Sequence, residues 1–249
     1  MYNPFSLEGK TILITGASSG IGAETAVECS RLGARVIITG RNEQRLQKTF
    51  SRLDVSFCNE HQLTPADLVN ETDISRLVEQ IDRIDGIVCN AGVNRIMPVA
   101  FIKEDDFEFV FRNNFFSALC LIRLLLKKKR FNRNSSIVFT SSVSAFFNAP
   151  GRALYASSKA AMTSLMRSIA VELADKGIRA NAVHPGLVET KLIHESLTEE
   201  ERNNALSEYP LRRFGKPEEI AWAIIYLLSD VSSWVTGTSM IVDGGFMLK

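Results

Sequence analysis

Short apolar runs alternate with segments of helical periodicity along almost the whole chain. The apolar runs predict strands at Thr11–Thr15, Arg35–Thr39, Gly86–Cys89, Ser136–Ser141, Ile178–His184 and Ser239–Val242, with a weaker strand before Asp67. The segments with helical periodicity are Ile21–Leu32, Glu43–Leu53, Ile74–Ile81, Asp105–Lys128, Ala153–Asp175 and Pro217–Ser229. Apolar strands are expected where helices cover both faces of a sheet, and strand–helix alternation implies right-handed crossovers. The pattern therefore predicts a doubly wound parallel α/β sheet in one domain over residues 1–249, with its ligands at the carboxyl ends of the strands.

Composition and charge are those of an ordinary globular chain. Hydrophobic residues make up 45% of the 249 residues and the formal net charge is +1, so the overall field favours neither nucleic acid nor a membrane surface. The four cysteines lie far apart and form no CxxC pair, which argues against zinc and against a disulfide framework. No apolar run approaches the ~20 residues that span a bilayer, and no signal-peptide pattern is seen. We expect a cytoplasmic protein with reduced thiols and no bound metal.

A glycine-rich segment, Gly16-Ala17-Ser18-Ser19-Gly20-Ile21-Gly22, joins the first predicted strand to the first predicted helix. Glycine permits a close approach of the backbone to a pyrophosphate, and the helix that follows offers free N–H groups to that anion. A P-loop would need Lys-Ser/Thr after the last glycine, but Ala23 and Glu24 stand there. The segment therefore predicts a dinucleotide site, with a simple tight turn as the alternative.

The second predicted strand ends at Thr39-Gly40-Arg41-Asn42, without the carboxylate that would bind the ribose hydroxyls and repel a 2′-phosphate. Arg41 can donate a charge-assisted pair of hydrogen bonds to such a phosphate. We therefore favour NADP(H) over NAD(H), with a solvated surface arginine as the alternative for Arg41.

Tyr155 and Lys159 lie one turn apart on the same face of a predicted helix. A phenol ordinarily titrates near ~10, too high for efficient proton transfer at neutral pH. A neighbouring ammonium favours the phenolate, so we expect Lys159 to lower the pKa of Tyr155.

Four motifs in this order resemble the short-chain dehydrogenase/reductase family: TGxxxGxG at Thr15–Gly22, Asn90-Ala91-Gly92, Tyr155-x-x-x-Lys159 and Pro185-Gly186. The resemblance covers nearly the whole chain. It implies a Rossmann-like fold and an NAD(P)-dependent oxidoreductase that interconverts a ketone and a secondary alcohol. The chain looks most like the bacterial 3-oxoacyl-[acyl-carrier-protein] reductases, which also suits the segment Arg212–Ile220 and the tail Val242–Phe246.

The resemblance also implies roles for individual residues. Ser142, thirteen residues before Tyr155, would hold the substrate oxygen, and Asn114 would extend a proton relay from Lys159, with Asn113 as the alternative register. Asp67 and Leu68 would meet the adenine, Val188 and Thr190 the nicotinamide. The full set of expected cofactor contacts is Gly16, Ser18, Ser19, Gly20, Ile21, Gly22, Arg41, Asp67, Leu68, Asn90, Ala91, Gly92, Tyr155, Lys159, Pro185, Gly186, Val188 and Thr190.

Residues 187–214 resemble the family's variable substrate lid, with an ordinary surface helix as the alternative. The substrate is expected to be a small carbonyl compound or an acyl thioester, the latter carried on acyl-carrier protein. The basic residues Lys127-Lys128-Lys129-Arg130 and Lys176 would then supply positive surface near the cleft, although cations at a helix C-terminus also complement its dipole. The family further implies a homotetramer. Two alternatives stay open: a dehydrogenase of another secondary alcohol, sugar or steroid, and a catalytically idle NADP-binding sensor or scaffold.

Overall fold

The computed structural model describes residues 2–57, 60–190 and 198–248. Its strands form one parallel sheet in the order β3-β2-β1-β4-β5-β6-β7. The strands are β1 (Thr11–Thr15), β2 (Arg35–Gly40), β3 (Gln62–Pro65), β4 (Ile84–Cys89), β5 (Phe131–Thr140), β6 (Arg179–Pro185) and β7 (Ser239–Val242). The order reverses between β1 and β4, and a doubly wound sheet opens its ligand crevice at such a point.

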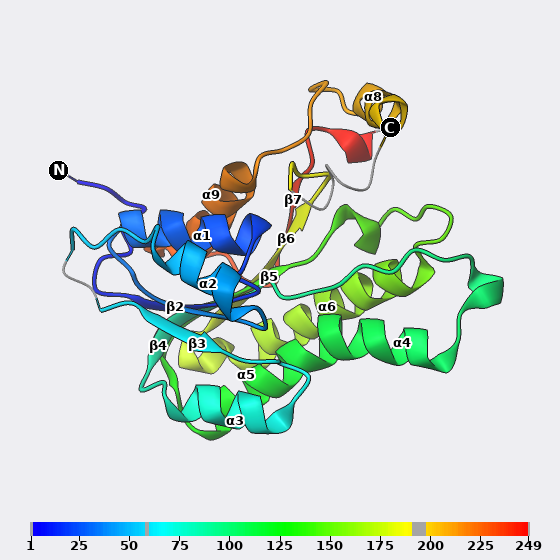
Figure 1. Ribbon diagram of the computed structural model, residues 1–249. Coiled ribbons are helices and arrows are strands. Elements are labelled where there is room, and N and C mark those ends of the chain that lie inside the picture. The colour runs from blue at the N-terminus through cyan, green and yellow to red at the C-terminus, as the bar shows by residue number, and fades with distance from the viewer. Residues whose placement is uncertain (1, 58–59, 191–197, 249) are drawn as a thin grey trace.

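Helices cover both faces of this sheet (Figure 1). They are α1 (Gly20–Arg31), α2 (Glu43–Phe50), α3 (Glu71–Glu79), α4 (Glu104–Phe111), α5 (Ser117–Lys127), α6 (Ala153–Glu172), α8 (Glu199–Ser207) and α9 (Pro217–Leu228). Figure 1 shows α1, α2 and α9 on one face and α3, α5 and α6 on the other, while α8 stands beyond the sheet near the C-terminus. The predicted doubly wound α/β fold is confirmed.

Local sequence explains where the helices begin. The Asn42 side chain accepts a hydrogen bond from the Arg45 amide at 2.9 Å and so caps α2. Asn70 caps α3 in the same way, and Thr198 with Glu201 forms a capping box at α8. Each of these helices therefore begins directly after the residue that caps it.

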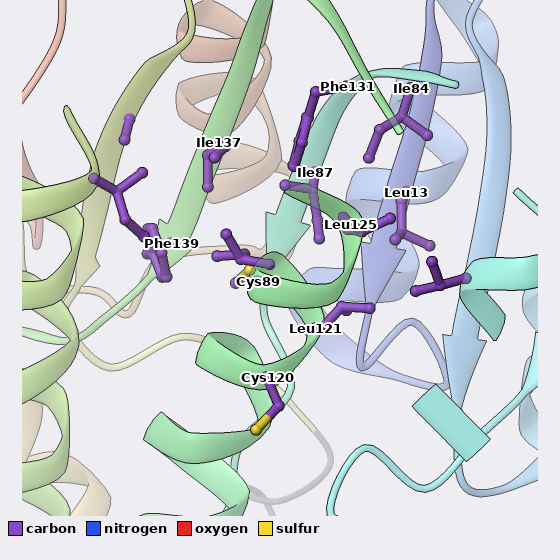
Figure 2. Close-up of a cluster of buried hydrophobic side chains, with 14 of the residues drawn as sticks. Leu13, Ile84, Ile87, Cys89, Cys120, Leu121, Leu125, Phe131, Ile137 and Phe139 are labelled. Carbon is purple, nitrogen blue, oxygen red and sulfur yellow. The ribbon is translucent and has the colours of Figure 1, made fainter. Parts of the chain in front are cut away.

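Two hydrophobic clusters fill the space between the sheet and its helices. Figure 2 shows the one beneath α3, α5 and α6, where Leu121 and Leu125 of α5 face Ile87 and Ile137 of the sheet. The other joins α1, α2 and α9 to the opposite face, through side chains such as Ala26, Leu46 and Ile224. Burial of this apolar area, at about 25 cal/mol per Å², is the main force that holds the strand ends in register.

The predicted long helix over 105–128 is interrupted. It comprises α4, a π-helical turn at Arg112–Phe116 and α5. π-turns insert one extra residue into a helix and are common at functional sites. Asn114 lies within this turn and is fully buried, so the irregularity coincides with a residue that the sequence analysis singled out.

The helical segment Glu104–Lys127 is long and apolar enough, by length and composition alone, to cross a membrane. The sequence analysis had expected no such stretch, because Arg123 interrupts the most aliphatic part. Its residues Leu121, Ile122 and Leu125 are packed in the core described above. Part of the apolar character of this helix is therefore explained by packing against the sheet.

Candidate active site

A cavity of about 1060 Å³ follows the carboxyl ends of β1, β2, β3 and β4. Gly16 has a φ of +64° there, and a Cβ at this position would lie 2.8 Å from the Cα of Ala91. Gly22 is equally confined, because a Cβ would lie 2.5 Å from the carbonyl oxygen of Gly16. Only glycine fits at either position, and the resulting bare backbone beside the N-terminus of α1 suits a dinucleotide pyrophosphate.

Hydrogen bonds between β1 and β4 fix the shape of this loop. The Thr15 hydroxyl accepts from the backbone amides of Asn90 at 3.0 Å and Ala91 at 3.1 Å. In return, the Asn90 side-chain amide donates to the carbonyl oxygens of Thr15 and Gly16, both at 3.3 Å. Asn90 therefore supports the glycine loop as well as lining the cavity.

Two arginines line the cavity at the end of β2. Arg41 is exposed there, which is compatible both with a contact to a 2′-phosphate and with the solvated surface arginine that the sequence left open. Arg45, in the first turn of α2, lines the same cavity and also a neighbouring one of about 310 Å³ beside Ser18 and Ser19. Sequence reasoning missed Arg45, although its place four residues after Arg41 at the start of a capped helix was the available signal.

Asp67 and Leu68 line the cavity beyond β3. The carboxylate of Asp67 accepts from the backbone amide of Val69 at 3.2 Å, so it also stabilises the local turn. Both interpretations that the sequence left open for Asp67 are therefore compatible with its position.

A second cavity, of about 240 Å³, adjoins the first and lies at the carboxyl ends of β5 and β6. Ser142, Tyr155 and Lys159 all line it. The hydroxyl of Ser142 accepts from the amide of Ser144 at 3.1 Å and is hydrogen-bonded to the Tyr155 side chain. Ser141 points elsewhere and donates to the carbonyl of Lys159 at 3.1 Å, as expected for a residue that packs at the strand end.

Lys159 is almost fully buried, and its ammonium donates to the carbonyl oxygen of Thr140 at 2.8 Å. Its Nζ lies 5.7 Å from the centre of the Tyr155 ring. Burial disfavours the charged form and lowers the pKa of Lys159 to about 8. A proton on this amine is therefore exchangeable near neutral pH.

The pKa of Tyr155 corrects one expectation. Burial of the phenol raises its pKa, and this effect outweighs the hydrogen bond with Ser142 and the charge of Arg152, both of which lower it. The sequence analysis expected Lys159 to lower the pKa of Tyr155, but the charge that lowers it is that of Arg152, and burial outweighs this effect. The protonated phenol is thus the stable form, which suits a proton donor.

Asn114 connects the loop after β4 to α6. Its side-chain amide donates to the carbonyl of Val93 and to the hydroxyl of Ser158, both at 2.9 Å, and its Oδ1 accepts from the Val93 amide at 2.7 Å. The side-chain amide of Asn113, the alternative register, donates back to the carbonyl of Phe109 at 2.8 Å, and Asn113 lines the dinucleotide cavity without a bond to the catalytic residues among the described residues. The geometry therefore favours Asn114 as the residue in the site, and its role in a proton relay stays a prediction.

Gly92 lets these side chains meet. A Cβ at Gly92 would lie 3.1 Å from Oδ1 of Asn114 and 3.5 Å from Nζ of Lys159. A larger residue would crowd both groups, so the glycine of Asn90-Ala91-Gly92 joins the two halves of the site. Cys89, which precedes this triplet, is buried in the core (Figure 2), as expected for a change in packing.

His184, at the end of β6, is a buried residue that sequence reasoning missed. Its Nδ1 lies 3.0 Å from the carbonyl oxygen of Ser142, and its ring packs against Phe146 with centroids 4.7 Å apart. Burial lowers the pKa of His184, so the neutral ring is favoured. An Nδ1–H that donates to this carbonyl fixes the backbone on which Ser142 stands.

The loop after β6 lines the catalytic cavity with Pro185, Gly186, Val188 and Thr190, as expected for contacts with a nicotinamide. It is held from the far side, because the Tyr209 hydroxyl accepts from the Leu187 amide at 2.8 Å. Arg202 of α8 also binds Glu189 at 2.9 Å. Of the expected lid at 187–214, the structure describes residues 187–190 and 198–214. Residues 191–197 lie outside the described residues.

The basic residues expected near the cleft lie elsewhere. Lys127–Arg130 immediately precede β5 and Lys176 precedes β6, so both are at the amino ends of these strands. Ser142 follows the carboxyl end of β5, ten residues further along. Part of β5 is taken up by a bulge, since Phe131 pairs with Ile84 and Phe139 with Cys89, five positions further along β4. At about 3.3 Å per position the basic cluster is still separated from the site by roughly 20 Å. Within one chain these residues cannot border the cleft, which corrects the sequence analysis.

A doubly wound sheet with a glycine-lined dinucleotide cavity and an adjoining Ser-Tyr-Lys cluster defines an oxidoreductase that uses a nicotinamide cofactor. A family model described as "Enoyl-(Acyl carrier protein) reductase" matches residues 16–247. The chain belongs to the short-chain dehydrogenase/reductase family.

The names of individual relatives indicate different substrates. The 3-oxoacyl-[acyl-carrier-protein] reductase FabG of Thermotoga maritima is 38% identical, over 97% of this chain and 99% of the relative. The glucose 1-dehydrogenase of Gluconobacter oxydans is 35% identical, over 96% of this chain and 92% of the relative. The crystal structure of a putative gluconate dehydrogenase from Agrobacterium tumefaciens has a TM-score of 0.88 at 28% identity and covers 99% of both chains.

Proposed function

We propose that this chain is an NADP(H)-dependent reductase that converts a ketone to a secondary alcohol, with 3-oxoacyl compounds as its substrate class. The observation that carries the proposal is the cavity where Ser142, Tyr155 and Lys159 meet the glycine-lined dinucleotide cavity. The 38% identity to a 3-oxoacyl-[acyl-carrier-protein] reductase supports the substrate class. Acyl-carrier-protein thioesters, and with them fatty acid biosynthesis, are the context that this relative's name indicates.

The proposed mechanism assigns each side chain one task. When bound, the reduced cofactor supplies the hydride. Tyr155 gives a proton to the substrate oxygen, and Ser142 donates a hydrogen bond to that oxygen, since the Ser144 amide already occupies one lone pair of the serine hydroxyl. Lys159 lies beneath the phenol and returns a proton to it, and Asn114 holds the loop and helix that carry these groups.

Use of NADP(H) is part of the proposal. Arg41 and Arg45 place two positive charges at the end of β2, and no acidic side chain is found among the described residues that line this part of the cavity before Asp67. A 2′-phosphate would therefore meet cations and no carboxylate at this end of the site.

A homotetramer in the cytoplasm is also proposed. Large apolar side chains are exposed on the two long helical segments that would form its interfaces, Phe107, Phe109 and Phe116 on the first and Val171 on the second, the last 81% exposed. Light scattering on purified protein tests this directly. The basic cluster before β5 would reach a cleft only in another copy, so carrier binding through it requires the oligomer.

The test is an assay with 3-oxoacyl thioesters, diketones and sugars, each with NADPH and with NADH. We expect NADPH-dependent reduction of 3-oxoacyl compounds. Oxidation of sugars without reduction of 3-oxoacyl compounds would favour the second candidate, a sugar dehydrogenase, which the glucose 1-dehydrogenase relative supports. NADPH binding without turnover of any compound would favour a sensor.

A further inference from the structure

Arg152 is a cation at the catalytic cavity whose presence the proposed mechanism does not explain. It stands three residues before Tyr155, at the start of α6, and lines both the dinucleotide cavity and the catalytic cavity. Its charge lowers the pKa of Tyr155 and of Tyr209, and Tyr155 lines the same catalytic cavity as Arg152. Arg152 is therefore within reach of the reacting centre.

No structural role accounts for this arginine. Within residues 2–57, 60–190 and 198–248 its side chain forms no ion pair and no hydrogen bond, and it does not cap α6. Because α6 presents the positive end of its dipole here, a cation destabilises the helix rather than supporting it. The arginine is retained at a local electrostatic cost.

Arg152 has no acidic partner at the catalytic cavity. The nearby carboxylate of Asp243, behind Gly186, accepts from the backbone amides of Gly245 and Met247. The described residues that line the catalytic cavity include no Asp or Glu, and their other cation, Lys159, is bonded to Thr140. Asp67, the acid of the dinucleotide cavity, follows β3, four strands from β5 in the sheet. At about 4.8 Å per strand that is roughly 19 Å away.

We propose that Arg152 binds a carboxylate of the substrate, so that among oxo compounds of the proposed class the chain reduces a short free oxo acid faster than the corresponding neutral ester or thioester. A guanidinium matches a carboxylate with two parallel hydrogen bonds, whereas a thioester offers it no charge. The carboxylate takes no part in the redox step: hydride adds to the ketone carbon, the proton of Tyr155 adds to its oxygen, and NADPH is oxidised.

This inference rests on the proposed function and specifies that its substrate carries a free carboxylate. The experiment compares 2-oxo, 3-oxo and 4-oxo acids of four to six carbons with their methyl esters, and with the matching 3-oxoacyl thioester. The enzymes are wild type, Arg152→Gln, Arg152→Lys and, as a control on the exposed face of the same helix, Arg167→Gln.

For wild type we expect one acid to exceed its ester in kcat/KM by about 10–100-fold, the range for a hydrogen-bonded charge. Arg152→Gln should remove this preference mainly through a higher KM for the acid, and the loss should be much larger on the acid than on the ester. Arg152→Lys should restore part of it, and Arg167→Gln should behave as wild type. Butanoate should inhibit wild type competitively and Arg152→Gln much less.

Two results would overturn the inference and leave the proposed function intact. One is equal use of acid and ester, or reduction of the thioester but not the acid. The other is an equal loss on acid and ester in Arg152→Gln, which would mark Arg152 as a structural residue. If wild type reduces none of these ketones with either cofactor, the proposed function fails and the inference fails with it.

Discussion

The two ends of the long cleft bind in different ways. At the ends of β1 to β3, the site is made of bare glycine backbone and exposed arginines. At the ends of β4 to β6, it is made of buried side chains, Asn114, Ser142 and Lys159, whose polar groups are bonded to one another and to the backbone. Substitutions at the first end should change affinity for the nucleotide alone, whereas those at the second should change chemistry and stability together.

The difference between the two ends follows from how far their polar groups are exposed to solvent. Exposed charges are screened, so each contributes modestly and can be exchanged without harm to the fold. A buried ammonium or amide is expensive unless it is bonded, so Asn114 and Lys159 each have a structural partner. Four experiments test this contrast.

The largest effect should come from Tyr155→Phe. Loss of the proton donor should lower turnover by up to about 10⁴-fold, the upper range for general acid catalysis. NADPH affinity, measured by fluorescence titration, should be unchanged, because the ring remains. Undiminished turnover would remove Tyr155 from the mechanism.

Lys159→Met should abolish most turnover yet stabilise the protein. A pKa lowered from 10.5 to about 8 means that the folded chain holds this proton about 3 kcal/mol less well than the unfolded chain. This destabilisation of the folded chain is fully present below pH 8 and disappears as the pH rises towards 10.5. The substitution also leaves the Thr140 carbonyl without its donor, which lowers the free energy of unfolding by about 1–2 kcal/mol. Urea unfolding at pH 7 should therefore show a net gain of about 1 kcal/mol, and Lys176→Met, an exposed control, should show none.

Arg41→Asp should reduce the preference for NADPH over NADH by about tenfold, as a screened charge contact with phosphate would. Arg45→Gln should act in the same direction with a smaller effect. The melting temperature should not change in either variant. Arg83→Asp, the same charge change at an exposed position before β4, serves as the control. An unchanged preference in Arg41→Asp would exclude this residue from the site.

The fourth experiment is a pH profile, which changes no side chain. Because the pKa of Lys159 is about 8, its ammonium is lost as the pH rises through that value. Ketone reduction, measured as kcat/KM, should be constant below pH 8 and fall by about tenfold per unit above it. A profile that stays flat to pH 10 would contradict a role for the charged form.

Much of the fold could be predicted because it depends on local pattern. The strand at Thr11–Thr15 and the helix start at Pro217 were predicted at their observed positions, since an apolar run and a helix-initiating proline act over a few residues. The π-turn at Arg112–Phe116 could not be predicted. It is stabilised by bonds from Asn114 to Val93 and Ser158, 21 and 44 residues away.

The sequence by itself determined the class of protein, because the glycine segment, Tyr155 and Lys159 have a spacing that fixes their chemistry once a strand or helix carries them. Only the tertiary structure decided the electrostatics. It showed that burial raises the pKa of Tyr155, that the basic cluster before β5 is remote from the cleft, and that Arg152 lies beside the reacting centre without an acidic partner among the described residues. The physical reason is that solvation and charge pairing depend on neighbours that are distant in sequence and meet only in the folded chain.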